Sequence, residues 1–489
     1  MLTEWYWVAP AAIGFGWQGQ LINALFWFFL IYQIIVGTSY ISLNIIALYV
    51  VRRSTRGGKN LHLPRVYESS LPGVSILLTA YNEEQLIATS VRSLLQLDYP
   101  LFELIVIHDG GSDDTLGVMQ REFDMYPCPY AFEYAVSCKP IKQIYRSRSH
   151  PNLIMVDKIN GGGKADANNA GINVARMPLY CGMDADSILD RDSLLRVVRT
   201  FLEKPDTIAA GGSVRIVNGC QVHDGRLIKT GLPYSWLSRI HVLEYLRAFL
   251  FGRLGWSRLQ ALLIISGAFG VFNREKVIEV GGYLSTSLGE DMELVVRLHR
   301  YALDKKRPYT INFVPDPVCW TDAPEDRATL RKQRIRWQRG LLETLYAHRS
   351  LCFQKGSGKV GWLAFPFMVI VEALSPIIEI LGLIFTVLLA YFGYLNLGAS
   401  LLFLAAVVGL GLLLSSLALV LEERSFHVYP SYKDTFTLFL WAVLENFGYR
   451  QMNSWWRLQG TWQWLRKSES KWGVMVRNTS WMTESPTSK

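Results

Sequence analysis

Residues 179–192, LYCGMDADSILDRD, contain the pattern that decides the fold. The apolar run 179–183 is typical of a buried strand, and it leads directly to Asp184 and Asp186. In open parallel sheets, ligands bind at the carboxyl ends of the strands, so these two acids lie where a ligand would bind. Their spacing lets both carboxylates offer oxygen atoms to a hard divalent cation that bridges a diphosphate. We therefore expect a metal site at the end of this strand.

Similar strands are predicted on both sides of this one. Short apolar runs alternate with helical stretches from residue 72 to about residue 350, and they lie at 74–81, 103–108, 152–156 and 208–214. This alternation is typical of an α/β domain. We expect one soluble α/β domain over residues 72–350, which is long enough to bury a core.

The first two predicted strands also end in polar residues. LLTAYNEEQ (77–85) places Thr79, Tyr81 and Glu83 at the end of the first strand, where a nucleotide could lie. ELIVIHDGGSDDT (103–115) places Asp109 at the end of the second strand, before a Gly-Gly turn that lets the backbone approach a ligand. Both stretches also have a simpler explanation, because such residues cap helices and form turns.

A glycine-rich turn precedes Lys164 in INGGGKADANNAG (159–171). A P-loop would need glycine at position 158 and Ser or Thr at position 165, where this chain has Lys158 and Ala165, so that motif is excluded. A lysine at the start of a helix still suits phosphate oxygens, through its charge and through the free backbone N–H groups beside it. We expect Lys164 to contact a phosphate.

An acidic pair, Glu290 and Asp291, follows a glycine in GED (289–291) at the predicted start of a helix. An acid at this position can be a helix cap. If an acid of this pair faces the site, it is the candidate general base, because removing a proton from a hydroxyl needs a carboxylate within hydrogen-bond reach.

The last motif, QRIRW (333–337), lies in a basic stretch with a helical pattern. Gln333, Arg336 and Trp337 would share one face of that helix. They offer an amide, a guanidinium for a diphosphate and an indole plane for a sugar or an acceptor. The alternative is a basic helix that lies on anionic lipid.

Long apolar segments flank the predicted domain. Residues 21–51 carry no formal charge, and a tilted helix of that length fits a hydrocarbon core of ~30 Å. Aromatic residues precede this segment and basic residues follow it, so residues 1–20 are expected outside the cytosol, in the interface. Further transmembrane helices are predicted within 361–421. Residues 434–489 are expected to form an interfacial or re-entrant segment and a basic cytosolic tail.

The composition agrees with a membrane protein. Half of the 489 residues are hydrophobic, 19% are charged, and the formal net charge is +9. These values exclude a disordered chain and a wholly cytosolic enzyme. The positive charge lies beside the apolar segments, so we expect a membrane surface and an anionic small molecule as partners and no nucleic acid.

The ordered set TAYNEE, HDGGSDDT, GGGKADANNAG, DAD, GED and QRIRW, flanked by apolar segments, resembles the inverting family 2 glycosyltransferases of the membrane-embedded polysaccharide synthase group. That group includes the cellulose, hyaluronan and poly-N-acetylglucosamine synthases. The resemblance implies a Rossmann-like GT-A domain inserted between N-terminal and C-terminal transmembrane helices. One departure is His108, because the family usually has an acid before the position of Asp109.

The resemblance also implies a role for each motif. Asp184 and Asp186 would bind Mg²⁺ or Mn²⁺, and Asp291, with Glu290 beside it, would provide the catalytic base. The residues that would hold the nucleotide sugar are Thr79, Tyr81, Glu83, Asp109, Lys164, Asp184, Gln333, Arg336 and Trp337.

The implied enzyme transfers a sugar, with inversion, from a nucleotide sugar that is expected to carry uridine. The product would be a growing β-linked exopolysaccharide that passes across the membrane. The implied partners are the nucleotide sugar, a glycan or lipid-linked acceptor, the membrane, and either further copies of the chain or accessory export proteins. The implied location is the inner (plasma) membrane, with several spans and a cytosolic catalytic domain.

Two alternatives stay open at this point. One is a transferase that adds a single sugar to a lipid-linked or short glycan acceptor. The other is an inactive membrane receptor or scaffold with the same fold. The sequence contains every acid that the chemistry needs, which argues against the second alternative.

Overall fold

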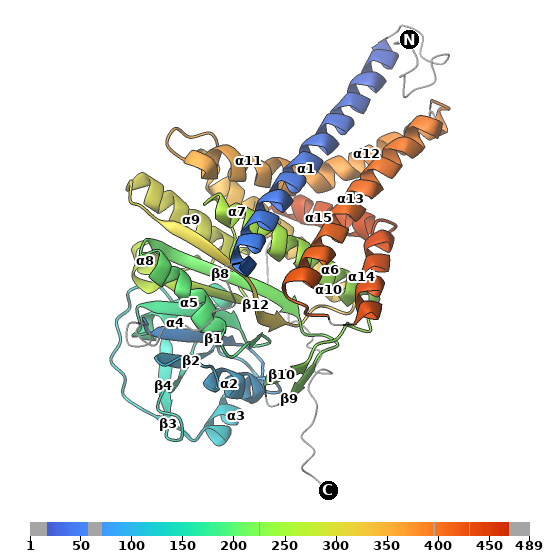
Figure 1. The fold of residues 1–489 in the computed structure, drawn as a ribbon. Helices are drawn as coiled ribbons and strands as arrows, with labels where there is room; N and C mark the ends of the chain where they lie inside the picture. The colour runs from blue at the N-terminus through green and yellow to red at the C-terminus, as the bar shows by residue number, and fades with distance from the viewer. Residues whose placement is uncertain (1–16, 57–70, 224, 395–396, 430, 469–489) are drawn as a thin grey trace.

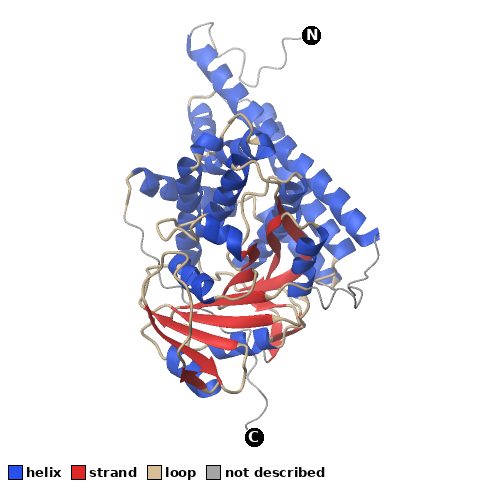
Figure 2. Cartoon of the chain, turned by 90° about the vertical axis from the view of Figure 1, so that its left-hand side faces the viewer, coloured by secondary structure: helices blue, strands red, loops and turns tan. Residues whose placement is uncertain are grey.

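The computed structural model describes residues 17–56, 71–223, 225–394, 397–429 and 431–468. Two predictions fall, in part, outside the described residues: the interfacial segment 1–20, for its residues 1–16, and the basic tail, for residues 469–489. Figures 1 and 2 show a sheet with its covering helices at one end of the molecule and a group of long helices at the other.

A ten-stranded mixed sheet forms the centre of the fold. Its strands are β1 (Val74–Ala80), β2 (Phe102–His108), β3 (Met125–Pro127), β4 (Ile141–Ser147), β5 (Leu153–Lys158), β6 (Leu179–Asp184), β7 (Ile188–Leu189), β8 (Thr207–Ile216), β11 (Phe269–Asn273) and β12 (Thr310–Thr321). Their order is β3-β4-β5-β2-β1-β6-β11-β8-β12-β7. β5, β2, β1 and β6 run parallel, whereas β11 lies antiparallel between β6 and β8. The predicted α/β class is confirmed.

Two strands beside the site, β11 and β12, were not among the predicted runs. β12 contains Pro315 and Pro317, and its pairing with β8 shifts register between Val314 and Pro317. Proline has no N–H to donate to a neighbouring strand, so it is confined to edges and bulges. The prolines therefore hide a long buried strand from an analysis of apolar periodicity.

Short helices cover the sheet and complete the α/β part. They are α2 (Ile87–Leu95), α3 (Thr115–Glu122), α4 (Lys164–Val174), α5 (Ser193–Glu203), α8 (Arg274–Glu279) and α9 (Glu290–Asp304). α4 packs against β1 and β2, and every residue of α4 after Lys164 is buried. Its Ala, Asn and Gly residues allow this close approach: a Cβ on Gly171 would lie 3.0 Å from the side chain of Leu77. The packing fixes Lys164 at the edge of the sheet.

Two long helices, α1 (Trp17–Arg56) and α13 (Leu397–Ser425), pack against each other and extend away from the sheet (Figure 1). By length and hydropathy, Gly19–Arg52 is the one helix of the described chain that could cross a membrane by itself. This helix contains the predicted span 21–51.

The apolar region after residue 360 is broken in the structure. Val360–Ala373 and α12 (Ser375–Tyr391) meet at an angle of 41°. Pro376 lies in the first turn of α12, where its missing N–H interrupts the helical hydrogen bonds. If this bent pair is one span, the described chain has up to two candidate spans. The C-terminal transmembrane helices and the domain boundaries stay predictions.

The remaining helices bring the C-terminal region against the α/β part. They are α6 (Trp236–Tyr245), the π-helical segment η2 (Leu246–Arg253), α7 (Leu254–Arg258), α10 (Arg327–Ala347), α14 (Tyr432–Leu444) and α15 (Tyr449–Leu465). α15 packs along α10. The helix that carries QRIRW, α10, is therefore packed between α9 of the α/β part and α15 of the C-terminal region.

A buried ion pair joins the sheet to α13. Nη2 of Arg215, on β8, lies 2.6 Å from Oε2 of Glu422, and both side chains are almost fully inaccessible. Burial raises the pKa of Glu422, and the charge of Arg215 opposes that effect. The sheet and the long C-terminal helix are thus packed as one unit at this point.

Candidate active site

The predicted strand ends meet at one edge of the sheet. Thr79 on β1 pairs with Asp184 on β6, and Ala80 pairs with His108 on β2. Tyr81 lies just beyond β1 and its side chain is 47% exposed. This parallel register brings the polar residues after β1, β2 and β6 to a common edge, as predicted.

The loops that follow β1 and β2 hold each other by hydrogen bonds. Asn82, at φ 56°, accepts a hydrogen bond at Oδ1 from the backbone N–H of Ser112 (2.8 Å). The backbone N–H of Glu83 donates to Oγ1 of Thr115 (2.9 Å). Asn is one of the few residues that tolerate this left-handed conformation. The loop that carries Tyr81 and Glu83 is therefore fixed by the loop after β2.

Asp109, at the end of β2, is ion-paired with Lys158. The Lys158 side chain is fully buried, and its Nζ also lies 2.6 Å from Oδ2 of Asp166. The backbone N–H of Gly161 donates to Oδ1 of Asp109 (3.1 Å). Burial raises the pKa of Asp109, and the neighbouring Lys158 opposes that effect. Asp109 thus ties β2 to the glycine-rich turn, and its predicted contact with a nucleoside stays a prediction.

His108 fills the position where the resembled family usually has an acid. Its Nε2 accepts a hydrogen bond from the backbone N–H of Gly111 (3.2 Å), and its Nδ1 lies 2.8 Å from Oδ1 of Asp157. Since Nε2 accepts, the proton of a neutral ring lies on Nδ1 and is donated to Asp157. His108 therefore has a structural role, in which it fixes the Gly-Gly turn.

Lys164 is the first residue of α4, and it joins the end of β6 to the turn that precedes β11. Its Nζ donates to Oδ1 of Asp184 (2.6 Å) and to the carbonyl oxygen of Gly267 (2.5 Å). The Asp184 side chain is 36% exposed, whereas that of Lys164 is almost buried. A cation and a partly exposed carboxylate thus lie together at the predicted phosphate site.

Asp186 lies two residues beyond β6 and is buried. Its Oδ1 accepts long hydrogen bonds from Oγ of Ser187 (3.4 Å) and Oγ1 of Thr321 (3.5 Å). The described residues contain no group of three or more His, Cys, Asp or Glu side chains that could hold a metal ion. Two carboxylates still fit Mg²⁺ or Mn²⁺, because such ions commonly take one or two carboxylates together with substrate phosphates.

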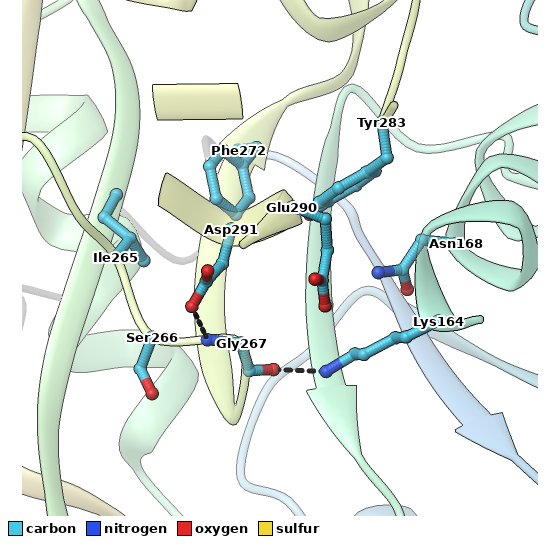
Figure 3. Close-up of a pocket in the computed structure, with 10 residues that line it drawn as sticks. Lys164, Asn168, Ile265, Ser266, Gly267, Phe272, Tyr283, Glu290 and Asp291 are labelled. Atoms are coloured by element: carbon cyan, nitrogen blue, oxygen red, sulfur yellow. Dashed lines mark hydrogen bonds between the residues drawn. The ribbon is translucent and has the colours of Figure 1, made fainter. Parts of the chain in front are cut away.

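The acidic pair Glu290 and Asp291 begins α9, as predicted, and faces Lys164 (Figure 3). Oδ2 of Asp291 accepts a hydrogen bond from the backbone N–H of Gly267 (3.2 Å). The carbonyl of the same Gly267 accepts from Lys164. The backbone of one residue, Gly267, therefore links the candidate base to the candidate phosphate-binding lysine.

The carboxylate of Glu290 is in an unusual electrostatic environment. Burial, followed by the charge of adjacent Asp291, raises the pKa of Glu290 to about 7. The charges of Lys164 and Arg336 act in the opposite direction. Asp291 is less buried than Glu290. The more accessible Asp291 is therefore better placed to meet a substrate hydroxyl.

The helix that carries QRIRW is α10, and it begins where Asp326 caps it through the backbone N–H of Thr329 (2.8 Å). Gln333 is buried, and its Oε1 has no hydrogen-bond partner among the described residues. Trp337 is 41% exposed, and the guanidinium of Arg334 stacks on its ring at 4.8 Å. Arg334 is in turn ion-paired with the partly buried Glu244 on α6. The indole is thus held while one side of it stays open.

A cavity of about 700 Å³ connects these elements. It extends from the sheet edge to side chains of α1, α13 and α15. Eight of the predicted site residues line it: Lys164, Asp184, Asp186, Glu290, Asp291, Gln333, Arg336 and Trp337. Thr79, Tyr81, Glu83 and Asp109 are not in its wall and lie along the adjoining strand ends.

Several polar residues in this wall were missed by the sequence analysis, among them Glu244, Arg253 and Asp322. Asp322 directly follows β12, so it obeys the rule that polar residues at strand ends mark a site, but β12 itself was not predicted. Glu244 and Arg253 lie in apolar helical segments without a recognisable motif, and only the packing of η2 and α6 reveals them.

Two known protein families match parts of this chain. Residues 75–130 match the family described as Glycosyl transferase family 2. Residues 182–420 match the family described as Glycosyl transferase family group 2. The first match contains the motifs after β1 and β2, and the second extends from within β6 into α13.

Two relatives are similar in sequence. The poly-β-1,6-N-acetyl-D-glucosamine synthase of Staphylococcus aureus (strain COL) is 30% identical over 284 residues, which is 58% of each chain. The enzyme of the same name from Staphylococcus epidermidis is 27% identical over 321 residues, which is 66% of each chain. The chain thus matches less than two thirds of the length of these curated relatives.

The fold is similar to that of a solved glycosyltransferase structure. A mannosyltransferase from Pyrobaculum calidifontis in complex with GDP-Man and Mn²⁺ superposes with a TM-score of 0.50 and 18% identity. The match covers 90% of this chain and 100% of that one. It supports the predicted GT-A-like arrangement of the sheet.

Proposed function

This chain belongs to glycosyltransferase family 2, as its motifs predicted, and from that premise we propose that it transfers a sugar with inversion from a nucleotide sugar to a glycan acceptor. The observation that carries the proposal is the single cavity in which Lys164, Asp184, Asp291 and Arg336 meet. These residues come from separate segments of the chain, yet they supply a base and the cations that a departing diphosphate needs.

In the proposed reaction, Asp291 accepts the proton of an acceptor hydroxyl. The oxygen of that hydroxyl attacks the anomeric carbon of the donor sugar. The bond between that carbon and the diphosphate oxygen breaks, and its electron pair leaves with the nucleoside diphosphate. Lys164 and Arg336 offset the charge that develops on the leaving group. Attack opposite the leaving group inverts the configuration, so an α-linked donor gives a β-linked product.

A divalent cation fits the donor side of this site. Asp184 and Asp186 would hold Mg²⁺ or Mn²⁺, which acts as a Lewis acid on diphosphate oxygens when it is bound. Nζ of Lys164 lies 2.6 Å from Oδ1 of Asp184. The lysine and the metal held by the two acids would therefore bind the same diphosphate. Thr79, Tyr81, Glu83 and Asp109 are proposed to contact the nucleoside, which we propose is uridine.

Polar atoms in the wall of the cavity support a carbohydrate acceptor. Beyond Trp337, its wall includes Asn44 on α1 and Asn453 on α15, and Oδ1 of each has no hydrogen-bond partner among the described residues. Such atoms are stabilised by a polar occupant such as a sugar hydroxyl. We propose that a growing β-linked polysaccharide extends from Trp337 along this route and crosses the membrane. The similarity to poly-β-1,6-N-acetyl-D-glucosamine synthases supports N-acetylglucosamine as its unit.

The proposed organisation follows from the same arrangement. The catalytic domain, residues 72–350, would lie in the cytosol, with α1 and the helices of 361–421 in the plasma membrane. Further copies of the chain or export proteins would complete the path. These statements are proposals that rest on the position of α1 and α13 above the sheet (Figure 1).

The test is a product assay with membranes that contain the full chain. UDP-N-acetylglucosamine and a panel of other nucleotide sugars would be supplied separately with Mg²⁺, and the products sized. We expect a polymer from UDP-N-acetylglucosamine that is degraded by an enzyme specific for β-1,6 linkages. A product with one added sugar would instead support single addition to a short or lipid-linked acceptor. No transfer from any donor would contradict the proposed function.

A further inference from the structure

Arg253, which lies outside all of the sequence motifs, is part of the cavity wall. It ends η2, which packs against α1 and α13 as well as against β8 and β12. π-helical turns are rare and occur frequently at functional sites. The guanidinium of Arg253 stacks on the ring of Phe249, with Cζ 3.7 Å from the ring centroid. Stacking covers the face of the guanidinium and leaves its edge, which carries the N–H donors, available to the cavity.

The guanidinium of Arg253 lacks a polar partner within the described part of the chain. Its Nη1 is buried without a hydrogen-bond acceptor, and no carboxylate of a described residue forms an ion pair with it. By contrast, Lys164, Arg247 and Arg334 line the same cavity and each is paired with a carboxylate. Burying an unpaired cationic group destabilises a fold, so this position indicates a ligand.

The location of Arg253 distinguishes between the two substrates. Its pKa is lowered to about 10 by burial, and the charge of Asp291 opposes that effect, which places Arg253 within electrostatic reach of the candidate base. Lys164 lies on the sheet side of the site and is engaged by Asp184. Arg253 belongs to the helical side. Asp291 must reach the hydroxyl of the acceptor. A group on the helical side of the cavity beside Asp291 would therefore contact the acceptor.

We propose that Arg253 binds the acceptor, by donating hydrogen bonds from its guanidinium edge to hydroxyl or amide carbonyl oxygens of the terminal sugar. This contact holds the attacking hydroxyl beside Asp291. The proposal rests on the proposed function, since that function defines the acceptor. It assigns the two sides of the cavity to different substrates: Lys164 and Arg336 to the diphosphate, and Arg253 to the acceptor.

The test compares Arg253→Gln and Arg253→Lys with Arg258→Gln, all in the full chain in detergent. Arg258 is exposed, so its variant is a control for the loss of one positive charge nearby. The probes are UDP and a β-linked N-acetylglucosamine oligosaccharide, with binding measured by calorimetry and transfer measured against the concentration of each substrate. Arg253→Gln should weaken oligosaccharide binding and raise the acceptor KM by about tenfold or more, as expected for a lost hydrogen bond to a charged group.

Arg253→Gln should change UDP binding and the donor KM by less than about twofold. Arg253→Lys should recover part of the acceptor affinity, because lysine keeps the positive charge but lacks the planar set of N–H donors of arginine. Equal oligosaccharide binding by wild type and Arg253→Gln would overturn the inference, as would an equal loss of UDP binding. Wild-type protein that binds no oligosaccharide would also overturn it. These results differ from failure of the proposed function, which is the absence of sugar transfer by the wild type.

Discussion

Gly289 and Gly340 lie in direct backbone contact where the start of α9 meets α10. A Cβ added to Gly340 would lie 2.7 Å from the backbone nitrogen of Gly289. Gly289 immediately precedes the acidic pair, and Gly340 is three residues beyond Trp337. This contact therefore sets the separation between the candidate base and the helix that carries Arg336 and Trp337.

Gly340→Ala should lower activity because α10 must move away from α9. We expect a loss of transfer of at least about tenfold, and a loss of stability of about 1–3 kcal/mol, the usual range for overpacking. Gly409→Ala, in helix α13, is the matched control, because a Cβ there meets no atom within 4 Å. Thermal unfolding and transfer assays on both variants check this, and equal behaviour of the two would contradict it.

Asp291→Asn should keep the fold and donor binding. The amide oxygen can still accept the hydrogen bond of Gly267, which Asp291 accepts at 3.2 Å. Transfer should fall by on the order of 10² to 10⁴, the usual contribution of a general base. Steady-state kinetics together with UDP binding measure this. Near-wild-type turnover in a folded variant would exclude Asp291 as the base.

Removal of divalent cations should abolish transfer, and Mg²⁺ or Mn²⁺ should restore it. Asp186→Ala should not be rescued by added metal, because the variant lacks one of the two carboxylates proposed to hold the ion. Asp192→Ala is a suitable control. Asp192 is an acid close to Asp186 in the sequence, but it forms an ion pair with Arg196 and is not proposed to hold the metal. Full activity in excess chelator would refute the metal role of Asp184 and Asp186.

Trp337→Ala and Arg336→Ala should have different effects. Loss of the partly exposed indole should shorten the polymer while some donor hydrolysis remains, because the indole is proposed to hold the acceptor. Loss of Arg336 should lower hydrolysis and transfer together, because the guanidinium acts on the diphosphate. Product sizing and release of nucleoside diphosphate measure the two effects. If both variants lose both activities equally, the assigned roles are wrong.

The pKa of Glu290 predicts a dependence of stability on pH. It is raised from 4.5 to about 7 in the folded protein, so between these values the folded chain binds more protons than the unfolded chain. This group's contribution to stability is therefore fully present below pH about 4.5 and is lost as the pH rises through about 7. Glu290→Gln should flatten the fall in melting temperature over that interval, as measured by thermal unfolding in detergent. An unchanged profile would contradict the raised pKa.

Much of the candidate site could be predicted because its residues follow simple local rules. Asp184 ends an apolar strand, Lys164 starts a helix after glycines, and Asp291 starts another helix. Each position is set by neighbours in the sequence, so pattern alone places it. The α/β class was predictable for the same reason, since strands and helices alternate.

Other parts depended on contacts between distant segments. Asp109 was expected to face a nucleoside, but its partner Lys158 lies 49 residues away on an adjacent strand, and no local pattern reveals that pair. Arg253 is notable only because packing leaves its Nη1 without a hydrogen-bond acceptor among the described residues. β12 was hidden by its prolines, which a buried strand tolerates here at shifts of register.

The ion pair between Arg215 and Glu422 limits how the protein can be divided. A shortened chain that stops before α13 would lack the carboxylate that pairs with Arg215, and removing one partner of a buried ion pair typically costs about 3–5 kcal/mol. That is a large part of the stability of an ordinary domain. The α/β part therefore depends on the C-terminal helices for its stability. Gene fusions or deletions that separate the two should yield aggregated protein.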